Sequence, residues 1–198
     1  MAAPALKYQT LERISVEEYL HLEKTAETKH EFVDGEVIAM ASATREHNEI
    51  VSNVIREIGL CLKGRECGIY PSDFRVITPA GRNYFYPDAT VVCGDLQLQP
   101  DVFDTLQNPI VIFEVVSEGT ENIDRGYKFF HYQQIPSLQE YILIDSRTRS
   151  IEAIRRQAND TWQFDKLSPT DGTLHLNSVG CSLSFDDIYY RVQLSPAS

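Results

Sequence analysis

The sequence lacks long apolar runs and is poor in basic residues. No run approaches the ~18–20 apolar residues that a transmembrane helix needs, and the first residues, MAAPALKYQTLER, lack the basic start and apolar centre of a signal peptide. With 18 Lys and Arg against 29 Asp and Glu, the formal net charge is −11. This charge argues against a generic nucleic-acid-binding protein, because phosphate contacts need a basic surface. These absences predict a cytoplasmic protein.

Cysteine is also scarce. The four cysteines show neither a CxxC spacing nor a histidine at the distance of a zinc ligand; they are Cys61, Cys67, Cys93 and Cys181. Neither a zinc site nor a disulfide framework is therefore indicated. We expect reduced thiols, most of them buried.

The length of 198 residues, with 42% hydrophobic and 24% charged residues, is typical of one ordinary globular domain. We expect residues 1–13 to form a weakly ordered arm and residues 14–198 to form a single domain.

The N-terminal part of the chain has three clear local signals. Ser15 with Glu18 matches a capping box and predicts a helix to about Glu27. Asp34 and Gly35 lie between two strand-like runs, so residues 30–40 are predicted to form a β-hairpin. Apolar residues at three- and four-residue spacing predict a helix over residues 44–63 that packs on a sheet.

Alternating and apolar runs dominate the rest of the chain. They predict strands at residues 68–78, 85–93, 109–117, 140–144, 150–155, 161–166 and 173–176, helices at residues 122–135 and from Ser184, and a loop at residues 94–108. The length of that loop favours a functional or oligomer-contacting role. The order of elements predicts an α/β fold, bordering on α+β, with a mixed central sheet flanked by helices.

Two acidic residues lie in apolar strands. Asp88 follows Pro87 at the edge of one strand, and Glu114 interrupts the most apolar one. Burying a lone carboxylate costs several kcal/mol, so either residue needs a cation or a donor. A strand-start turn for Asp88 and a structural salt bridge for Glu114 are the alternatives. Both carboxylates, with a strand carbonyl near Val115, suit one Mg²⁺ or Mn²⁺ ion.

Three further residues are candidates for the same site. Lys128, on the next predicted helix, suits stabilisation of a scissile phosphate or orientation of the attacking water; its alternative is an exposed pair with Asp124. Glu31 is either a further acid or an exposed strand residue, and His47 is a phosphate contact, a proton shuttle or a helix-surface histidine. A nuclease of this charge also needs basic residues at the mouth of its site. The candidates for that role are Arg45, Arg75, Arg82, Arg125 and Lys128.

The Pro-Asp pair followed by a strand glutamate 26 positions later (114 − 88) resembles the PD-(D/E)xK nuclease superfamily, the fold of many restriction endonucleases. The usual lysine position, two residues after the glutamate, is Val116. In a bacterial branch of the superfamily, formerly a domain of unknown function, the strand reads EVxS and the lysine lies on the next helix in a DRGxK context. Ser117 and residues 124–128 match that variant, as do residues 31–36, His47 and residues 140–141, and the resemblance covers roughly residues 12–190.

The resemblance implies metal-dependent hydrolysis of DNA phosphodiester bonds, with Asp88 and Glu114 as ligands and Lys128 as the catalytic lysine. It also implies a restriction-endonuclease-like mixed sheet. A catalytically silent module of the same fold, which binds a partner or DNA or forms a homo-oligomer, is the alternative that the acidic charge and the lack of a basic tail favour. A homodimer is expected under either interpretation.

Overall fold

The computed structural model describes residues 13–40, 42–79, 83–100 and 105–194. Of the predicted N-terminal arm, only Arg13 falls among them. Within these ranges no helix is long and apolar enough to cross a membrane.

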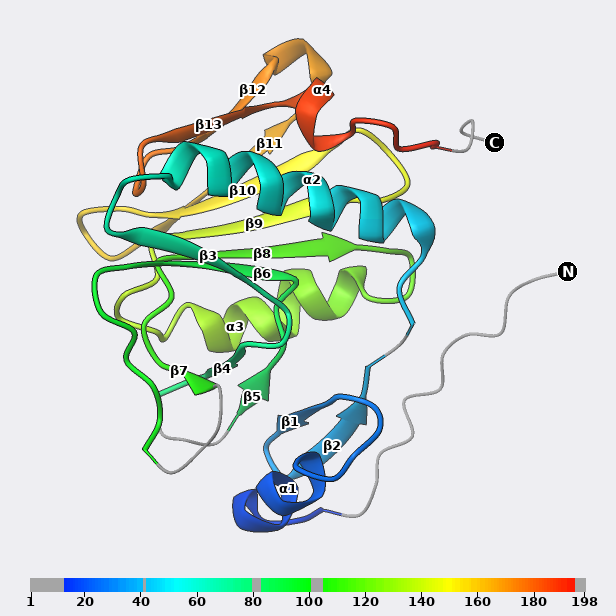
Figure 1. The fold of residues 1–198 in the computed structure, drawn as a ribbon, viewed down its shortest axis with the longest axis vertical. Helices are drawn as coiled ribbons and strands as arrows, with labels where there is room; N and C mark the ends of the chain where they lie inside the picture. Colours follow the sequence, from blue (N-terminus) through cyan, green and yellow to red (C-terminus); the bar gives the residue numbers. More distant parts are fainter. Residues whose placement is uncertain (1–12, 41, 80–82, 101–104, 195–198) are drawn as a thin grey trace, which may run out of the picture.

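A six-stranded mixed sheet is the centre of the fold (Figure 1). Its strands, in spatial order, are β11 (Trp162–Leu167), β10 (Ile151–Arg156), β9 (Glu140–Asp145), β8 (Val111–Val116), β6 (Ala89–Cys93) and β3 (Cys67–Pro71). β8 and β9 are parallel and their residues are buried throughout, whereas the other neighbours are antiparallel. The apolar run at residues 109–117 therefore forms a central strand, as predicted.

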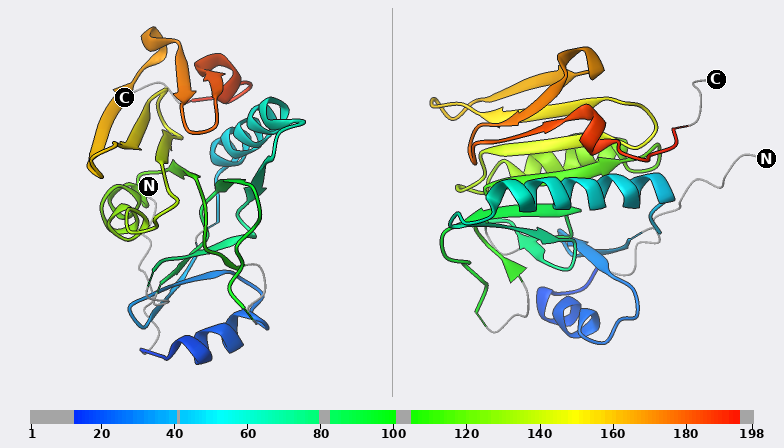
Figure 2. Two further views of the ribbon diagram at one scale, coloured as in Figure 1. Left: turned by 90° about the vertical axis from the view of Figure 1, so that its left-hand side faces the viewer. Right: turned by 45° about the horizontal axis from the view of Figure 1, so that its top comes forward.

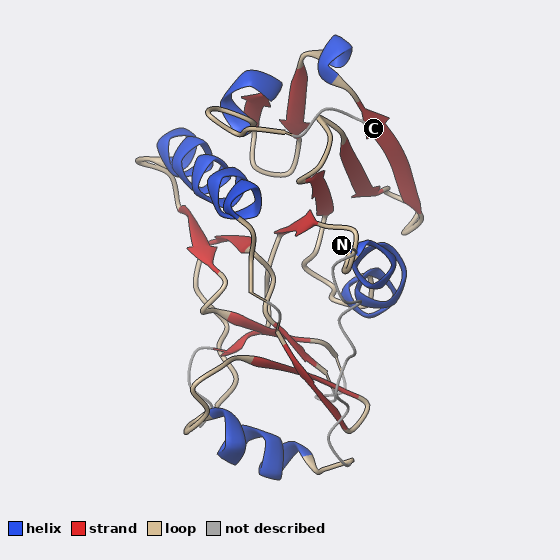
Figure 3. Ribbon diagram, turned by 90° about the vertical axis from the view of Figure 1, so that its right-hand side faces the viewer, coloured by secondary structure: helices blue, strands red, loops and turns tan. Residues whose placement is uncertain are grey.

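Helices cover both faces of this sheet. Figures 2 and 3 show α2 (Arg45–Leu62) on one face, and the π-helical turn η1 (Ile123–Lys128) with α3 (Phe129–Tyr132) on the other. Side chains of β8 alternate between the two cores: Phe113 packs in the α2 core and Ile112 in the α3 core. Glu114 lies at an even position of the strand and so faces η1 and α3.

A second, five-stranded sheet lies beside the first, with spatial order β2-β1-β5-β4-β7. Its strands are β1 (His30–Val33), β2 (Glu36–Ala39), β4 (Arg75–Ile77), β5 (Tyr84–Phe85) and β7 (Thr105–Leu106). The helix α1 (Val16–Glu23) packs on it through Tyr19, whose ring stacks on Phe32 at 4.8 Å. The predicted hairpin is present, and Asp34 and Gly35 both have positive φ angles, of 48° and 95°.

The C-terminal segment packs over α2. It consists of the 3₁₀ turn η2 (Pro169–Asp171), β12 (Thr173–Leu176), β13 (Cys181–Ser184) and α4 (Phe185–Ile188). The side chain of Asn53 on α2 donates hydrogen bonds to the carbonyls of Ile188 and Tyr190 at 3.0 and 2.9 Å. The last helix begins at Ser184 as predicted, with the side chain of that residue as its N-cap.

Several predicted elements are wrong in detail. Residues 68–78 and 85–93 each form two short strands that belong to different sheets, α1 ends at Glu23, and β13 was not predicted. The predicted helix at residues 122–135 begins as a π-helical turn, and its exposed side carries Tyr127 and Phe130. The predicted loop at residues 94–108 contains β7 and a bridge between Leu98 and Leu106, with residues 101–104 outside the description.

All four cysteines are paired, so the prediction of reduced thiols is wrong. Cys61 at the end of α2 bonds Cys181 on β13, and Cys67 on β3 bonds its cross-strand neighbour Cys93 on β6. The paired residues lie 120 and 26 positions apart in the sequence. No local sequence pattern predicts such pairs, because only the tertiary fold brings the paired cysteines together.

Candidate functional site

Asp88 lies where the ladder between β6 and β8 ends. The last backbone pair joins Ala89 and Phe113. One residue beyond it, the Oδ2 atom of Asp88 accepts a hydrogen bond of 2.7 Å from the backbone nitrogen of Val115. The carboxylate therefore continues the ladder in place of a backbone carbonyl, directly beside Glu114.

His47 contacts the same carboxylate from helix α2. It lies in the first turn of α2, where its backbone N–H donates to the capping hydroxyl of Thr44. Its Nε2 atom is 3.1 Å from Asp88 Oδ2, and the side chains of His47 and Asp88 are 18% and 15% exposed. This pair is the most open part of the candidate site.

Lys128 joins two of the predicted acids and a third carboxylate, that of Asp124. Its Nζ atom lies 2.9 Å from Glu31 Oε1, 3.1 Å from Glu114 Oε1 and 3.3 Å from Asp124 Oδ1. All four side chains are at most 9% exposed. The alternatives of an exposed Lys128 and an exposed Glu31 are therefore wrong, since one buried ammonium joins the hairpin, the central strand and η1.

Two more groups hold these carboxylates in place. The hydroxyl of Tyr132 on α3 donates to Glu114 Oε1 at 3.2 Å, and the backbone N–H of Tyr86 donates to Glu31 Oε1 at 3.3 Å. Tyr132 is fully buried. The acids are therefore fixed from two sheets and one helix.

The cluster has an excess of negative charge. Four carboxylates and one ammonium give a formal charge of −3 (1 − 4) when His47 is neutral. Burial raises the pKa of Glu114 well above its ordinary value; Lys128 opposes this shift, while Asp124, Asp88 and Glu31 add to it. Burial lowers the pKa of Lys128, but the carboxylates of Glu114, Glu31 and Asp124 outweigh it and raise that pKa well above its ordinary value.

The donor atoms fit a hard divalent cation. Among the described residues no three His, Cys, Asp or Glu side chains already form a metal-binding group, but Mg²⁺ is commonly bound by one or two carboxylates with waters. The backbone carbonyl of Val116 accepts a hydrogen bond from the backbone nitrogen of Ser146 and so points toward β9. Successive carbonyls of a strand point to opposite edges, so the carbonyl of Val115 points toward the edge where Asp88 lies. Asp88, Glu114 and the Val115 carbonyl thus supply oxygen ligands of the type that Mg²⁺ and Mn²⁺ prefer.

The basic residues expected at the mouth of the site are dispersed. Arg45 and Arg125 form ion pairs with neighbouring glutamates. Arg75 is buried and lies 5.8–5.9 Å from three tyrosine ring centres. Arg82 lies outside the described residues, and Lys128 is enclosed by acids. The sequence prediction of a basic cluster is not met in the described part of the chain.

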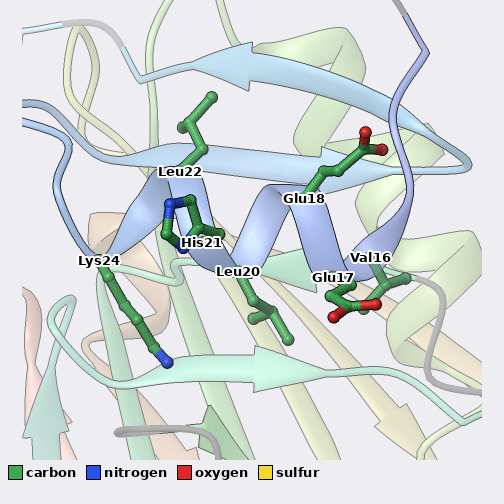
Figure 4. A pocket seen from close by; sticks show the side chains of 7 residues that line it. All are labelled: Val16, Glu17, Glu18, Leu20, His21, Leu22 and Lys24. Atoms are coloured by element: carbon green, nitrogen blue, oxygen red, sulfur yellow. The ribbon is translucent and has the colours of Figure 1, made fainter.

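A surface hollow lies along α1, apart from these residues. Figure 4 shows its lining side chains, which come from α1 and from its C-cap residue Lys24, among them Leu20 and His21. The five predicted site residues do not line it.

Two residues of the cluster were not predicted as functional. Asp124 was considered only as an exposed partner of Lys128, and Tyr132 was not among the candidates. The signal for Asp124 was present, because it lies four residues before Lys128 in the DRGYK motif. The contact of Tyr132 with Glu114 had no sequence signal.

A mixed sheet with an acid at the start of one strand, a second acid within the next and a lysine from the adjoining helix defines a restriction-endonuclease-like protein. The chain belongs to the Uma2 family, whose model is described as "Putative restriction endonuclease" and matches residues 16–186. This membership confirms the resemblance and the fold class expected from the sequence.

Two relatives from Synechocystis sp. (strain PCC 6803) are each 33% identical to this chain. Uncharacterized protein sll1609 aligns over 80% of this chain and 89% of its own length, and uncharacterized protein slr1290 over 89% and 92%. A crystal structure from Anabaena variabilis, described as a "putative nuclease belonging to DUF820", superposes with a TM-score of 0.73 at 19% identity. It covers 89% of this chain and 97% of that one, and so has the same fold.

Proposed function

We propose that this protein is a metal-dependent endonuclease that hydrolyses DNA phosphodiester bonds. One observation carries the proposal: Lys128 bridges Glu31 and Glu114 at 2.9 and 3.1 Å, while Asp88 is bonded to Val115, the residue after Glu114. Three buried carboxylates around one ammonium, with a fourth carboxylate beside them, are unusual in an ordinary core, since their desolvation is costly. The family description supports a nuclease.

Asp88, Glu114 and the Val115 carbonyl would hold Mg²⁺ or Mn²⁺, with Glu31 as a further acid. When bound, such an ion neutralises phosphate charge and lowers the pKa of water to give a nucleophile near neutral pH.

The protein's own groups have separate tasks. Lys128 donates hydrogen bonds toward the scissile phosphate or the attacking water. Its ion pairs with Glu31 and Glu114 fix the position of its Nζ atom. His47 holds Asp88 from the start of α2, and Tyr132 holds Glu114 from α3. We assign His47 a positioning role, because its side chain contacts a carboxylate.

The test is a cleavage assay on supercoiled and linear DNA with Mg²⁺ or Mn²⁺. We expect cleavage by the wild type and by Asp186→Ala, a control that removes an exposed ion pair with Arg149, and cleavage slower by about 10²–10³-fold in Asp88→Ala and in Lys128→Ala. Cleavage that is absent from the wild type, or that keeps the wild-type rate in both variants, contradicts the proposal.

The dispersal of the basic residues favours a second candidate, a catalytically silent module of the same fold that binds a partner. Titration calorimetry with Mn²⁺ separates the two, because the enzyme must bind the ion. Heat of binding in the wild type that disappears in Asp88→Ala supports the endonuclease, whereas absence of binding in the wild type supports the silent module.

Under both candidates we propose a homodimer, since most oligomers have two-fold symmetry; for the endonuclease, paired sites also suit cleavage of both strands. Light scattering after size-exclusion chromatography distinguishes a dimer from a monomer of 22.5 kDa.

A further inference from the structure

Asp124 is fixed at two points inside the protein. It is 3% exposed, and its Oδ1 atom lies 3.3 Å from Lys128 Nζ. Its backbone carbonyl accepts a hydrogen bond of 2.9 Å from the buried hydroxyl of Tyr141 on β9. Side chain and backbone thus connect the central sheet to the lysine.

The π-helical turn brings this contact about. Asp124 and Lys128 both face inward from η1, whereas Arg125 between them turns outward and makes two hydrogen bonds, of 3.0 and 2.7 Å, with Glu152 on β10. π-Helical turns are rare in proteins as a whole, and those that occur often lie at functional sites. Hydrogen bonds with Tyr141 on β9 and Glu152 on β10 therefore hold the turn on the sheet, and the turn directs Lys128 toward Glu114.

The three carboxylates around Lys128 are not equivalent. Glu31 comes from the hairpin and Glu114 from the central strand, and both are candidate acids of the reaction. Asp124 alone lies on the same turn as the lysine. Its contact holds the lysine relative to its own helix without involving the candidate metal ligands.

We propose that Asp124 is a positioning residue that sets the place of the Lys128 ammonium for the reaction. This inference rests on the proposed function. It differs from a purely structural ion pair, because it requires Asp124 to act through Lys128.

The kinetic test uses Asp124→Ala and Asp124→Asn in the full chain. We expect Asp124→Ala to lower kcat about 10–100-fold, as loss of a supporting contact commonly does, with KM changed much less. Asparagine keeps an oxygen that accepts from Nζ, so Asp124→Asn should restore most of kcat. Asp160→Ala, which removes an exposed i,i+4 pair with Arg156, is the matched control and should cleave as the wild type does.

A double-mutant cycle distinguishes positioning from structure. In a Lys128→Ala background, Asp124→Ala should cause no further loss of residual cleavage, because the group through which it acts is gone. A further loss equal to that of the single variant would overturn the inference.

An activity-independent readout is the ¹⁵N NMR signal of the Lys128 ammonium, identified by its absence from Lys128→Ala. We expect a resolved signal in the wild type and in Asp124→Asn, and its loss or broadening in Asp124→Ala. If the wild type does not cleave DNA but this pattern holds, the nuclease proposal fails while Asp124 still fixes the Lys128 ammonium, so the two failures are distinguished. An unchanged signal in Asp124→Ala, or no signal in the wild type, overturns the positioning role. Should Asp124→Ala not fold, Asp124→Glu, which keeps the charge but displaces the oxygens, takes its place with the same expected loss.

Discussion

The Oδ2 atom of Asp88 accepts a hydrogen bond of 2.7 Å from the backbone nitrogen of Val115. The bond lies just beyond the last backbone pair between β6 and β8, so one carboxylate ends the ladder and is also bonded to the residue that follows Glu114. Its structural and chemical roles are therefore separable by substitution.

We predict different results for Asp88→Ala and Asp88→Asn. Alanine leaves the N–H of the buried Val115 without its acceptor, which should lower the free energy of unfolding by about 1–3 kcal/mol. Asparagine keeps an acceptor, so its stability should lie close to that of the wild type while Mn²⁺ affinity falls. Urea denaturation and titration calorimetry measure the two effects. Equal stability of all three proteins would show that the hydrogen bond contributes little.

Removal of the ammonium should destabilise the protein in a pH-dependent way. Lys128→Met leaves Glu31, Glu114 and Asp124 without their shared cation, and the loss of one partner of a buried ion pair costs about 3–5 kcal/mol. Burial already raises the pKa of Glu114, and loss of the opposing ammonium raises this folded-state pKa further, so the penalty is full at pH 8 and smaller at pH 5, where the folded protein binds an extra proton. Denaturation at both pH values tests this. A penalty independent of pH would contradict the electrostatic origin.

Local signals in the sequence predicted local structure well. Ser15 and Glu18 form the capping box of α1, Asp34 and Gly35 form the hairpin turn, and Ser184 caps the last helix. Each depends on hydrogen bonds between residues a few positions apart, which the sequence contains in full.

The parts that the sequence did not predict depend on distant residues. The strand expected at residues 85–93 is divided at Pro87, since Tyr84 pairs with Phe32 while Ala89 pairs with Phe113 in the other sheet. The same limit applied to the site. Asp88, Glu114 and Lys128 were each predicted from their own part of the sequence, whereas the burial of Lys128 among three acids depends on the sheet and on the π-helical turn.

Gly126 should tolerate a side chain, although it belongs to the DRGYK motif. A Cβ atom placed there meets nothing within 4 Å. Alanine costs less conformational entropy than glycine in a helix, so Gly126→Ala should raise the free energy of unfolding by up to about 1 kcal/mol. The contrasting variant is Gly35→Ala, where φ is +95° and the free energy of unfolding should fall. Thermal unfolding of both variants is the measurement, and a destabilised Gly126→Ala would indicate a conformational need in the turn.

His131 should make the fold sensitive to mild acid. Its Nδ1 atom lies 2.9 Å from Asn83 Nδ2, a contact that requires the unprotonated nitrogen as acceptor. Burial lowers the pKa of His131, although Asp34 acts in the opposite direction. The unfolded chain therefore takes up the proton first, and the stability present above the unfolded value of about 6.5 is lost as the pH falls through the folded-state pKa. His131→Asn, which keeps an acceptor without titrating, should flatten the pH dependence of unfolding below pH 7; an unchanged slope would assign it to other groups.

The two disulfides should stabilise the fold unequally. Cross-linking stabilises mainly by restricting the unfolded chain, typically by about 2–4 kcal/mol and more for longer loops. The Cys61–Cys181 bond closes a separation of 120 residues and the Cys67–Cys93 bond one of 26, so the pair Cys61→Ser and Cys181→Ser should lose more stability than Cys67→Ser and Cys93→Ser. Urea denaturation of both double variants, with and without reductant, measures the difference.

The same cysteines test the expected cytoplasmic location, because disulfides persist mainly in oxidising compartments. Because the four cysteines are paired, alkylation of unfolded protein from cells lysed in the alkylating agent should label no cysteine before reduction and four after it, a result that contradicts the cytoplasmic location expected from the sequence. Four labelled cysteines before reduction would show that the thiols are free in the cell, as the sequence predicted, and that the pairs form only on oxidation.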